Sequence, residues 1–174
     1  MANTVENSIE IDGPVSAVFA FVDDYKNTTR YIVGMTEYKP MTKQVSGKGS
    51  QFHFVKKTTG LPDIKSDVEI ADWAEDKKIT FKSFNGFDNG GSYSFTTKGG
   101  KTVVKLSNTY DLASLLGGGR GGFLGGIGKA VGGGLSKAAE GQVRKDLTKS
   151  LESLRDLVEA TPRKPAAKKA AAKK

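Results

Sequence analysis

The chain has 174 residues, a net charge of +8, one histidine and no cysteine. This length suits a single domain with one hydrophobic core. The missing cysteines exclude disulfides and thiolate metal sites, and the lone histidine excludes catalysis by a histidine pair, so we expect neither a metal nor a cofactor.

The first residues predict one strand followed by a helical wedge. Apolar side chains at alternate positions indicate a strand over residues 5–11. Pro14 suits the first turn of a helix, which apolar residues at helical spacing extend to about Asp23. A second short helix is predicted over residues 25–32. Because neither a basic, apolar leader pattern nor a membrane-length apolar run is present, we expect a cytoplasmic protein.

Alternation of period two dominates the following residues, up to residue 112. Short breaks rich in glycine, asparagine and aspartate separate the alternating runs at hairpin spacing. Consecutive hairpins make an antiparallel meander, which argues against parallel βαβ units. The predicted strands cover residues 35–41, 50–57, 65–74, 77–84, 91–98 and 102–112.

Residues 117–141 include 12 glycines among 25 positions. Each glycine inside a helix costs roughly 1 kcal/mol relative to alanine, so this segment is not expected to form a stable helix unaided. It is either a flexible connector or a lid that touches a membrane. The lid hypothesis rests on apolar residues interspersed with basic ones, chiefly Phe123, Leu124 and Ile127.

One long amphipathic helix is predicted after this segment, ending near Ala160. Its apolar residues recur every three or four positions, which places them in one stripe along the helix. The stripe is formed by Val143, Leu147, Leu151, Leu154 and Val158.

Residues 161–174 form a tail of lysine, arginine, alanine and proline that we expect to be disordered. Without its six bases the chain has 21 basic and 19 acidic residues, so the body of the protein is nearly neutral. The tail would attract DNA or an anionic membrane, or would simply aid solubility. Its basic residues are Arg163, Lys164, Lys168, Lys169, Lys173 and Lys174.

Three segments of the chain carry a family resemblance. They are residues 8–25 (SIEIDGPVSAVFAFVDDY), 68–81 (VEIADWAEDKKITF) and 92–104 (SYSFTTKGGKTVV). They resemble the SRPBCC superfamily, which includes START, birch-pollen-allergen and polyketide cyclase/dehydrase-like proteins, over about residues 5–160. The resemblance implies an α+β helix-grip fold, with a curved antiparallel sheet wrapped around a long C-terminal helix. It also implies one ligand-binding domain over residues 1–160, followed by the tail.

A cavity is expected between the sheet and the last helix, both from this resemblance and because a strongly bent sheet and one helix cannot pack closely along their full length. Alternation and helical spacing predict which side chains face it. For any single one of them ordinary core is the preferred interpretation, and the cavity prediction rests on the set. Asn108 and Tyr110 are the preferred contacts for a polar atom of a ligand. The full set of predicted ligand contacts is Phe52, Phe54, Val68, Ile70, Phe81, Tyr93, Phe95, Leu106, Asn108, Tyr110, Val143, Leu147 and Leu151, and Ile79 is also expected to face inward.

No catalytic residue is evident from the sequence. His53 alternates with two phenylalanines, which predicts that it points away from the apolar face as an exposed or edge residue rather than a catalytic base. We expect the strand carboxylates of Asp67, Glu69 and Asp72 to be solvated, and their spacing pairs no two of them across a substrate.

Three functions fit these observations, in order of preference. The first is a non-enzymatic binder or carrier of a hydrophobic small molecule such as a lipid, quinone or polyketide. The second is a polyketide cyclase/dehydratase-like enzyme, in which the shape of the cavity steers a reactive chain. The third is an interaction protein tethered to DNA or an anionic membrane by its tail. We expect a monomer or weak dimer, cytoplasmic or peripheral to a membrane.

Overall fold

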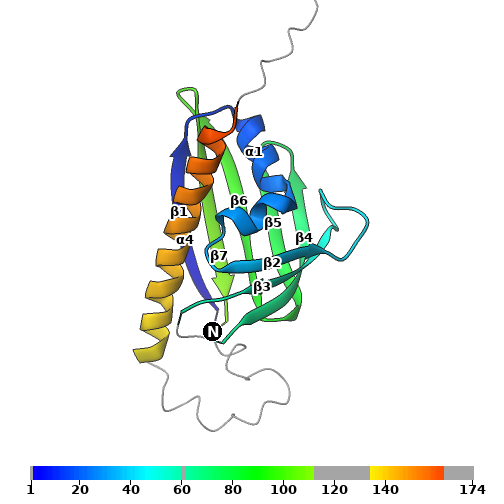
Figure 1. Ribbon diagram of the computed structural model, residues 1–174, viewed down its shortest axis with the longest axis vertical. Coiled ribbons are helices and arrows are strands. Elements are labelled where there is room, and N and C mark those ends of the chain that lie inside the picture. The colour runs from blue at the N-terminus through cyan, green and yellow to red at the C-terminus, as the bar shows by residue number, and fades with distance from the viewer. Residues whose placement is uncertain (1, 60–61, 112–133, 163–174) are drawn as a thin grey trace, which may run out of the picture.

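The computed structural model describes residues 2–59, 62–111 and 134–162 (Figure 1). All seven predicted strands and the predicted helices are present, with ends within about three residues of the expected ones, except at the start of the last helix. In chain order the elements are β1 (Asn3–Ile11), α1 (Val15–Asp23), the 3₁₀ turn η1 (Tyr25–Asn27), α2 (Thr28–Tyr31), β2 (Met35–Pro40), β3 (Gln51–Lys56), β4 (Ile64–Ala74), β5 (Lys78–Gly86), β6 (Asn89–Lys98), β7 (Lys101–Tyr110) and α4 (Gly134–Ala160).

The strands form a single antiparallel sheet in the order β1-β7-β6-β5-β4-β3-β2. Irregularities in register occur between Met35 and Glu37 of β2 and at two places in the pairing of β4 with β5, after Asp67 and after Ile70. Such bulges bend a strand and increase its twist, so the sheet curls around the helices instead of lying flat. This arrangement confirms the predicted α+β helix-grip fold (Figure 1).

The helices cover the concave face of the sheet, and α4 runs beside β1 (Figure 1). The predicted apolar stripe of α4 supplies buried side chains, among them Leu147, Leu151 and Leu154. Helix α1 buries Val18 and Phe19. Leu151, Leu154, Val18 and Phe19 lie in the packed part of the interior, whereas Leu147 lines a cavity beside it.

Helix α4 begins earlier than the glycine content predicts. The expected helix starts after residue 141, whereas α4 starts at Gly134 and includes Gly141. The reason lies in residues 135–140 (LSKAAE), which contain no glycine and mostly good helix formers. The expectation that the whole of 117–141 is non-helical is therefore wrong for its last eight residues.

Replacing Gly141 with alanine is expected to stabilise the protein by about 1 kcal/mol. Gly141 lies within α4, and an added Cβ would meet no atom within 4 Å. Urea denaturation would measure the change. As a control, Gly99 also has open space around it but a φ of +56°, so alanine there should give no gain. Equal effects at the two positions would contradict this explanation.

Two predicted functional segments lie outside the described residues. One is the lid, with Phe123, Leu124 and Ile127, and the other is the basic tail with its six charged residues. Their roles stay predictions, as does the division into a domain and a tail. Among the helices that the structure describes, none combines the length and apolarity needed to cross a membrane.

Candidate functional site

A cavity of about 140 Å³ lies between the concave face of the sheet and the helices. This volume is close to the ~150 Å³ at which an apolar protein cavity binds benzene. Strands β2 to β7 and helices α1, α2 and α4 all contribute to its wall. Most of the lining side chains are aliphatic or aromatic, so the cavity suits an apolar guest with few polar atoms.

Ten of the thirteen predicted contact residues line this cavity. The eight on strands face inward because alternate residues of a strand share one face of the sheet, and the two on α4 belong to its apolar stripe. Ile79, also expected to face inward, lines it as well. Contact with a ligand stays a prediction for all of them. The ten are Phe52, Phe54, Val68, Ile70, Phe81, Tyr93, Leu106, Asn108, Val143 and Leu147.

Phe95, Tyr110 and Leu151 are buried but do not line the cavity. The Phe95 ring packs edge to face against Phe19 of α1, with ring centroids 5.2 Å apart, so α1 fills that end of the interior. Leu151 is only 2% exposed, within the packed core. These three residues therefore lie in the solid core and not, as predicted, in the cavity wall.

The sequence did not predict that the helical wedge (α1, η1 and α2) and β2 contribute to the cavity wall. Lys56 could have been found, since it continues the alternation of Phe52 and Phe54, but its charge argued for solvent. No local pattern marks the loop that follows β2 as part of the wall. The lining residues that were not predicted are Val22, Asp23, Tyr25, Thr28, Tyr31, Ile32, Met35, Tyr38, Val45, Ser46, Lys56, Asn89 and Ser150.

The loop between β2 and β3 forms part of the cavity wall, and Asp23 at the end of α1 holds it in place by a hydrogen bond. One oxygen of the Asp23 carboxylate accepts a hydrogen bond from Ser46 Oγ (2.6 Å), and the other accepts one from Trp73 Nε1 (2.9 Å). Ser46 and its neighbour Val45 both line the cavity. Asp23 thus fixes the loop against both α1 and β4.

Two buried phenols place a hydrogen-bond donor in the cavity wall. Tyr31 Oη donates to Tyr93 Oη at 3.3 Å, which leaves the Tyr93 proton for another acceptor. Burial raises the pKa of Tyr93 to about 12 and raises the pKa of Tyr31 as well. Both hydroxyls are therefore neutral at physiological pH, and they act as hydrogen-bond donors rather than anions.

Asn108 presents an acceptor to the same cavity. Its Oδ1 atom is buried and has no hydrogen-bond partner among the described residues. Buried polar atoms are nearly always paired, so a lone amide oxygen in a cavity wall indicates a place for a ligand atom or a water molecule. Tyr110 Oη also lacks a partner in the described part of the chain, but it lies outside the cavity wall.

Lys56 places a basic group in the cavity wall. Its side chain is 18% exposed, and its Nζ atom lies 3.7 Å from Oδ2 of Asp146, which is 7% exposed on α4. Burial lowers the pKa of Lys56, and the Asp146 carboxylate acts in the opposite direction. The other oxygen of Asp146 accepts a hydrogen bond from Gln142 Nε2 at 2.7 Å.

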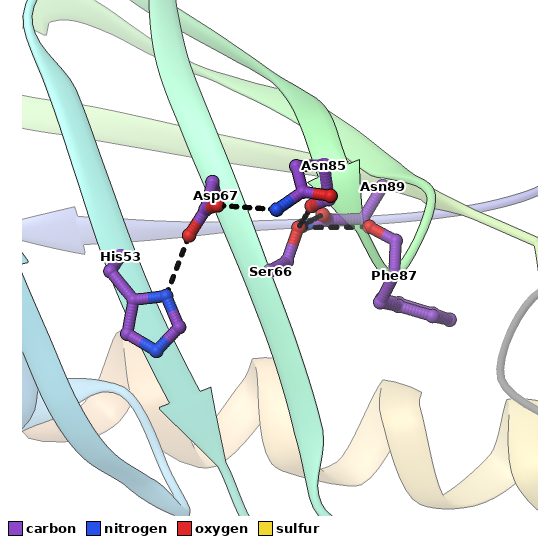
Figure 2. Close-up of polar contacts among 6 residues, drawn as sticks. All are labelled: His53, Ser66, Asp67, Asn85, Phe87 and Asn89. Atoms are coloured by element: carbon purple, nitrogen blue, oxygen red, sulfur yellow. Dashed lines mark hydrogen bonds and ion pairs between the residues drawn. The ribbon is translucent and has the colours of Figure 1, made fainter.

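A second polar cluster lies on the opposite, outer face of the sheet. Asp67 accepts hydrogen bonds from Nδ1 of His53 (2.6 Å) and Nδ2 of Asn85 (2.7 Å), as Figure 2 shows. His53 points away from the apolar face, as predicted. Asp67, however, is buried rather than solvated, because its cross-strand neighbours on β3 and β5 cover it. Asp72 is exposed, as expected, and Glu69 is partly buried.

This outer cluster predicts a pH-dependent contribution to stability. The hydrogen bonds from Asn85 and His53 lower the pKa of Asp67. The ionised Asp67 carboxylate therefore contributes its full stabilisation above the unfolded-state pKa of ~3.9. This contribution is lost as pH falls through the lower pKa of the folded state. Asp67→Asn should cost on the order of 1 kcal/mol at pH 6, and this difference should shrink below about pH 4.

Denaturation at several pH values would measure this effect. Asp72→Asn is the matched control, since that carboxylate lies on the same strand but is 58% exposed. A loss at Asp72 equal to that at Asp67 would contradict the assignment. Within the described ranges, no three histidine, aspartate or glutamate side chains come together as a metal site would require.

Comparison with solved structures supports the helix-grip assignment. The protein TTHA0849 from Thermus thermophilus is 18% identical with a TM-score of 0.71, over 90% of this chain and 97% of that one. The Zhui aromatase/cyclase from Streptomyces sp. R1128 is 9% identical with a TM-score of 0.67, over 91% and 94%. The major latex-like protein 151 from Panax ginseng is 18% identical with a TM-score of 0.53, over 63% and 79%. These identities establish a shared fold and nothing finer.

Comparison with curated proteins yields no match. A family model described as polyketide cyclase/dehydrase and lipid transport matches residues 2–159, nearly all of the chain. This match confirms the resemblance carried by the three segments of the sequence. The chain therefore belongs to the polyketide cyclase/dehydrase and lipid transport family, within the SRPBCC superfamily.

Proposed function

We propose that this protein binds an apolar small molecule of about the size of one substituted ring in the cavity between its sheet and α4. The molecule is held mainly by aromatic and aliphatic side chains of β3 to β7. Such a guest gains from removal of its apolar surface from water, at roughly 25 cal/mol per Å².

The observation that supports this proposal most is the chemistry of the cavity wall. Aliphatic and aromatic side chains make up most of the wall of a space of about 140 Å³, and polar groups are the minority. Asn108 offers an acceptor and Tyr93 offers a donor. A mostly apolar space with a small number of placed polar groups is typical of small-molecule sites.

Native mass spectrometry of freshly purified protein tests the proposal. We expect either an additional mass from a co-purifying apolar molecule or saturable binding of added 4-ethylacetophenone, a ketone with a single ring. Protein that shows neither, at ligand concentrations up to the millimolar range, would contradict the proposal.

A second candidate is an enzyme that steers the cyclisation of a reactive polyketone, as the family description allows. The paired phenols of Tyr31 and Tyr93 favour it, because the free Tyr93 proton would polarise a carbonyl oxygen of an enclosed chain. Incubation with a poly-β-keto substrate tests this candidate. Faster cyclisation than in buffer, reduced by Tyr93→Phe, would support catalysis, and an unchanged product distribution would leave the binding role alone.

A further inference from the structure

Lys56 and Asp146 give the cavity a chemical preference of its own. We propose that Lys56 donates a hydrogen bond to a neutral carbonyl oxygen of the bound molecule, and that Asp146 behind it disfavours carboxylates. The ligand class is then an apolar ketone, or a related carbonyl compound, rather than a fatty or aromatic acid. This inference rests on the binding function proposed above.

Within the described part of the protein, the Asp146 carboxylate is the one partner of the Lys56 ammonium group. An ammonium group has three protons. Its ion-pair partner, Asp146 Oδ2, lies at 3.7 Å, beyond the 2.7–3.2 Å of an ordinary hydrogen bond. Lys56 lines the cavity next to Phe54 on the same face of β3, whereas Asp146 does not line it. The Lys56 side chain can therefore contact a ligand in the cavity, whereas Asp146 lies outside the cavity wall.

The position of Asp146 decides which acceptor fits. The carboxylate is almost fully buried, and Gln142 holds its second oxygen. A ligand carboxylate at Lys56 would therefore become a second buried negative charge beside the first, and it would also lose its own hydration. A ketone oxygen adds no charge and loses little hydration. The same ion pair that supports Lys56 in a buried position therefore selects a neutral partner.

Three probes of similar shape separate these effects in titration calorimetry at pH 7. They are 4-ethylacetophenone, 4-ethylbenzoate and the hydrocarbon 1-ethyl-4-isopropylbenzene. We expect the wild-type protein to bind the ketone at least about tenfold more tightly than the benzoate. The double variant Lys56→Met/Asp146→Asn, which leaves no unpaired buried charge, should bind the ketone about tenfold more weakly and the hydrocarbon within about twofold of wild type. Asp146→Asn alone should strengthen benzoate binding by about tenfold.

The outcomes distinguish this inference from the binding function itself. If the hydrocarbon binds and the double variant keeps full affinity for the ketone, the role of Lys56 is wrong while the binding function stands. Tighter binding of benzoate than of ketone by the wild-type protein would likewise overturn the preference. If none of the three probes binds and no apolar molecule co-purifies with the protein, both proposals are wrong.

Discussion

Replacing Val143 with tryptophan is expected to weaken binding of 4-ethylacetophenone by at least about 100-fold, or ~3 kcal/mol. Val143 lies on α4, is half-buried and lines the cavity. A larger indole side chain there would extend into the space of about 140 Å³ and occupy much of it. Because it fills a cavity rather than a packed core, the free energy of unfolding should change by less than about 1 kcal/mol.

The matched control for this substitution is Val158→Trp. Val158 lies on the same helix and is partly buried against the core, but it does not line the cavity. Titration calorimetry of both variants would measure the affinities, and thermal denaturation would confirm that both are folded. If the two variants bind the ketone equally well, the cavity is not the binding site.

Replacing Gly91 with alanine is expected to lower the free energy of unfolding by about 3 kcal/mol. Gly91 lies in β6, where an added Cβ would overlap the Ser107 carbonyl oxygen and lie 2.7 Å from Cζ of Phe81. The Ser107 carbonyl belongs to the neighbouring strand β7, so it cannot move far without disturbing the sheet. The Phe81 ring lines the cavity, and its displacement should also weaken ligand binding.

Gly90→Ala is the control for this second substitution. There the added Cβ would approach the Phe81 carbonyl oxygen only to 3.2 Å, which small shifts relieve. We expect a loss of about 1 kcal/mol or less in urea denaturation. Equal losses at the two glycines would show that glycine is simply preferred in this strand, and that close packing against Phe81 and Ser107 is not the cause.

The sheet was predictable from the sequence because its signals are local. Alternation and turn residues predict a strand over residues 65–74, and β4 spans Ile64–Ala74. The same alternation gives the inward direction of Phe52 and Phe54, since a strand that is buried on one face has no other register available. For the long helix, the stripe that includes Leu147 predicts the buried face correctly.

The polar parts of the site depend on contacts between distant residues, and the sequence does not specify these. Lys56 and Asp146 are 90 positions apart, and they meet only after α4 has packed against the sheet. Asp67 looks like a solvated strand carboxylate until the register places His53 and Asn85 on either side of it. The loop that carries Val45 has no apolar periodicity, and Asp23 fixes its position through Ser46.

Nuclear Overhauser effects between 4-ethylacetophenone and methyl-labelled protein would test the central claim most directly. If the ligand occupies the cavity, its ring protons should show cross-peaks to the methyl groups of Val68, Ile70 and Leu106, which all line that space. Cross-peaks confined to exposed residues such as Met41, or none at saturating ligand, would contradict an internal binding site.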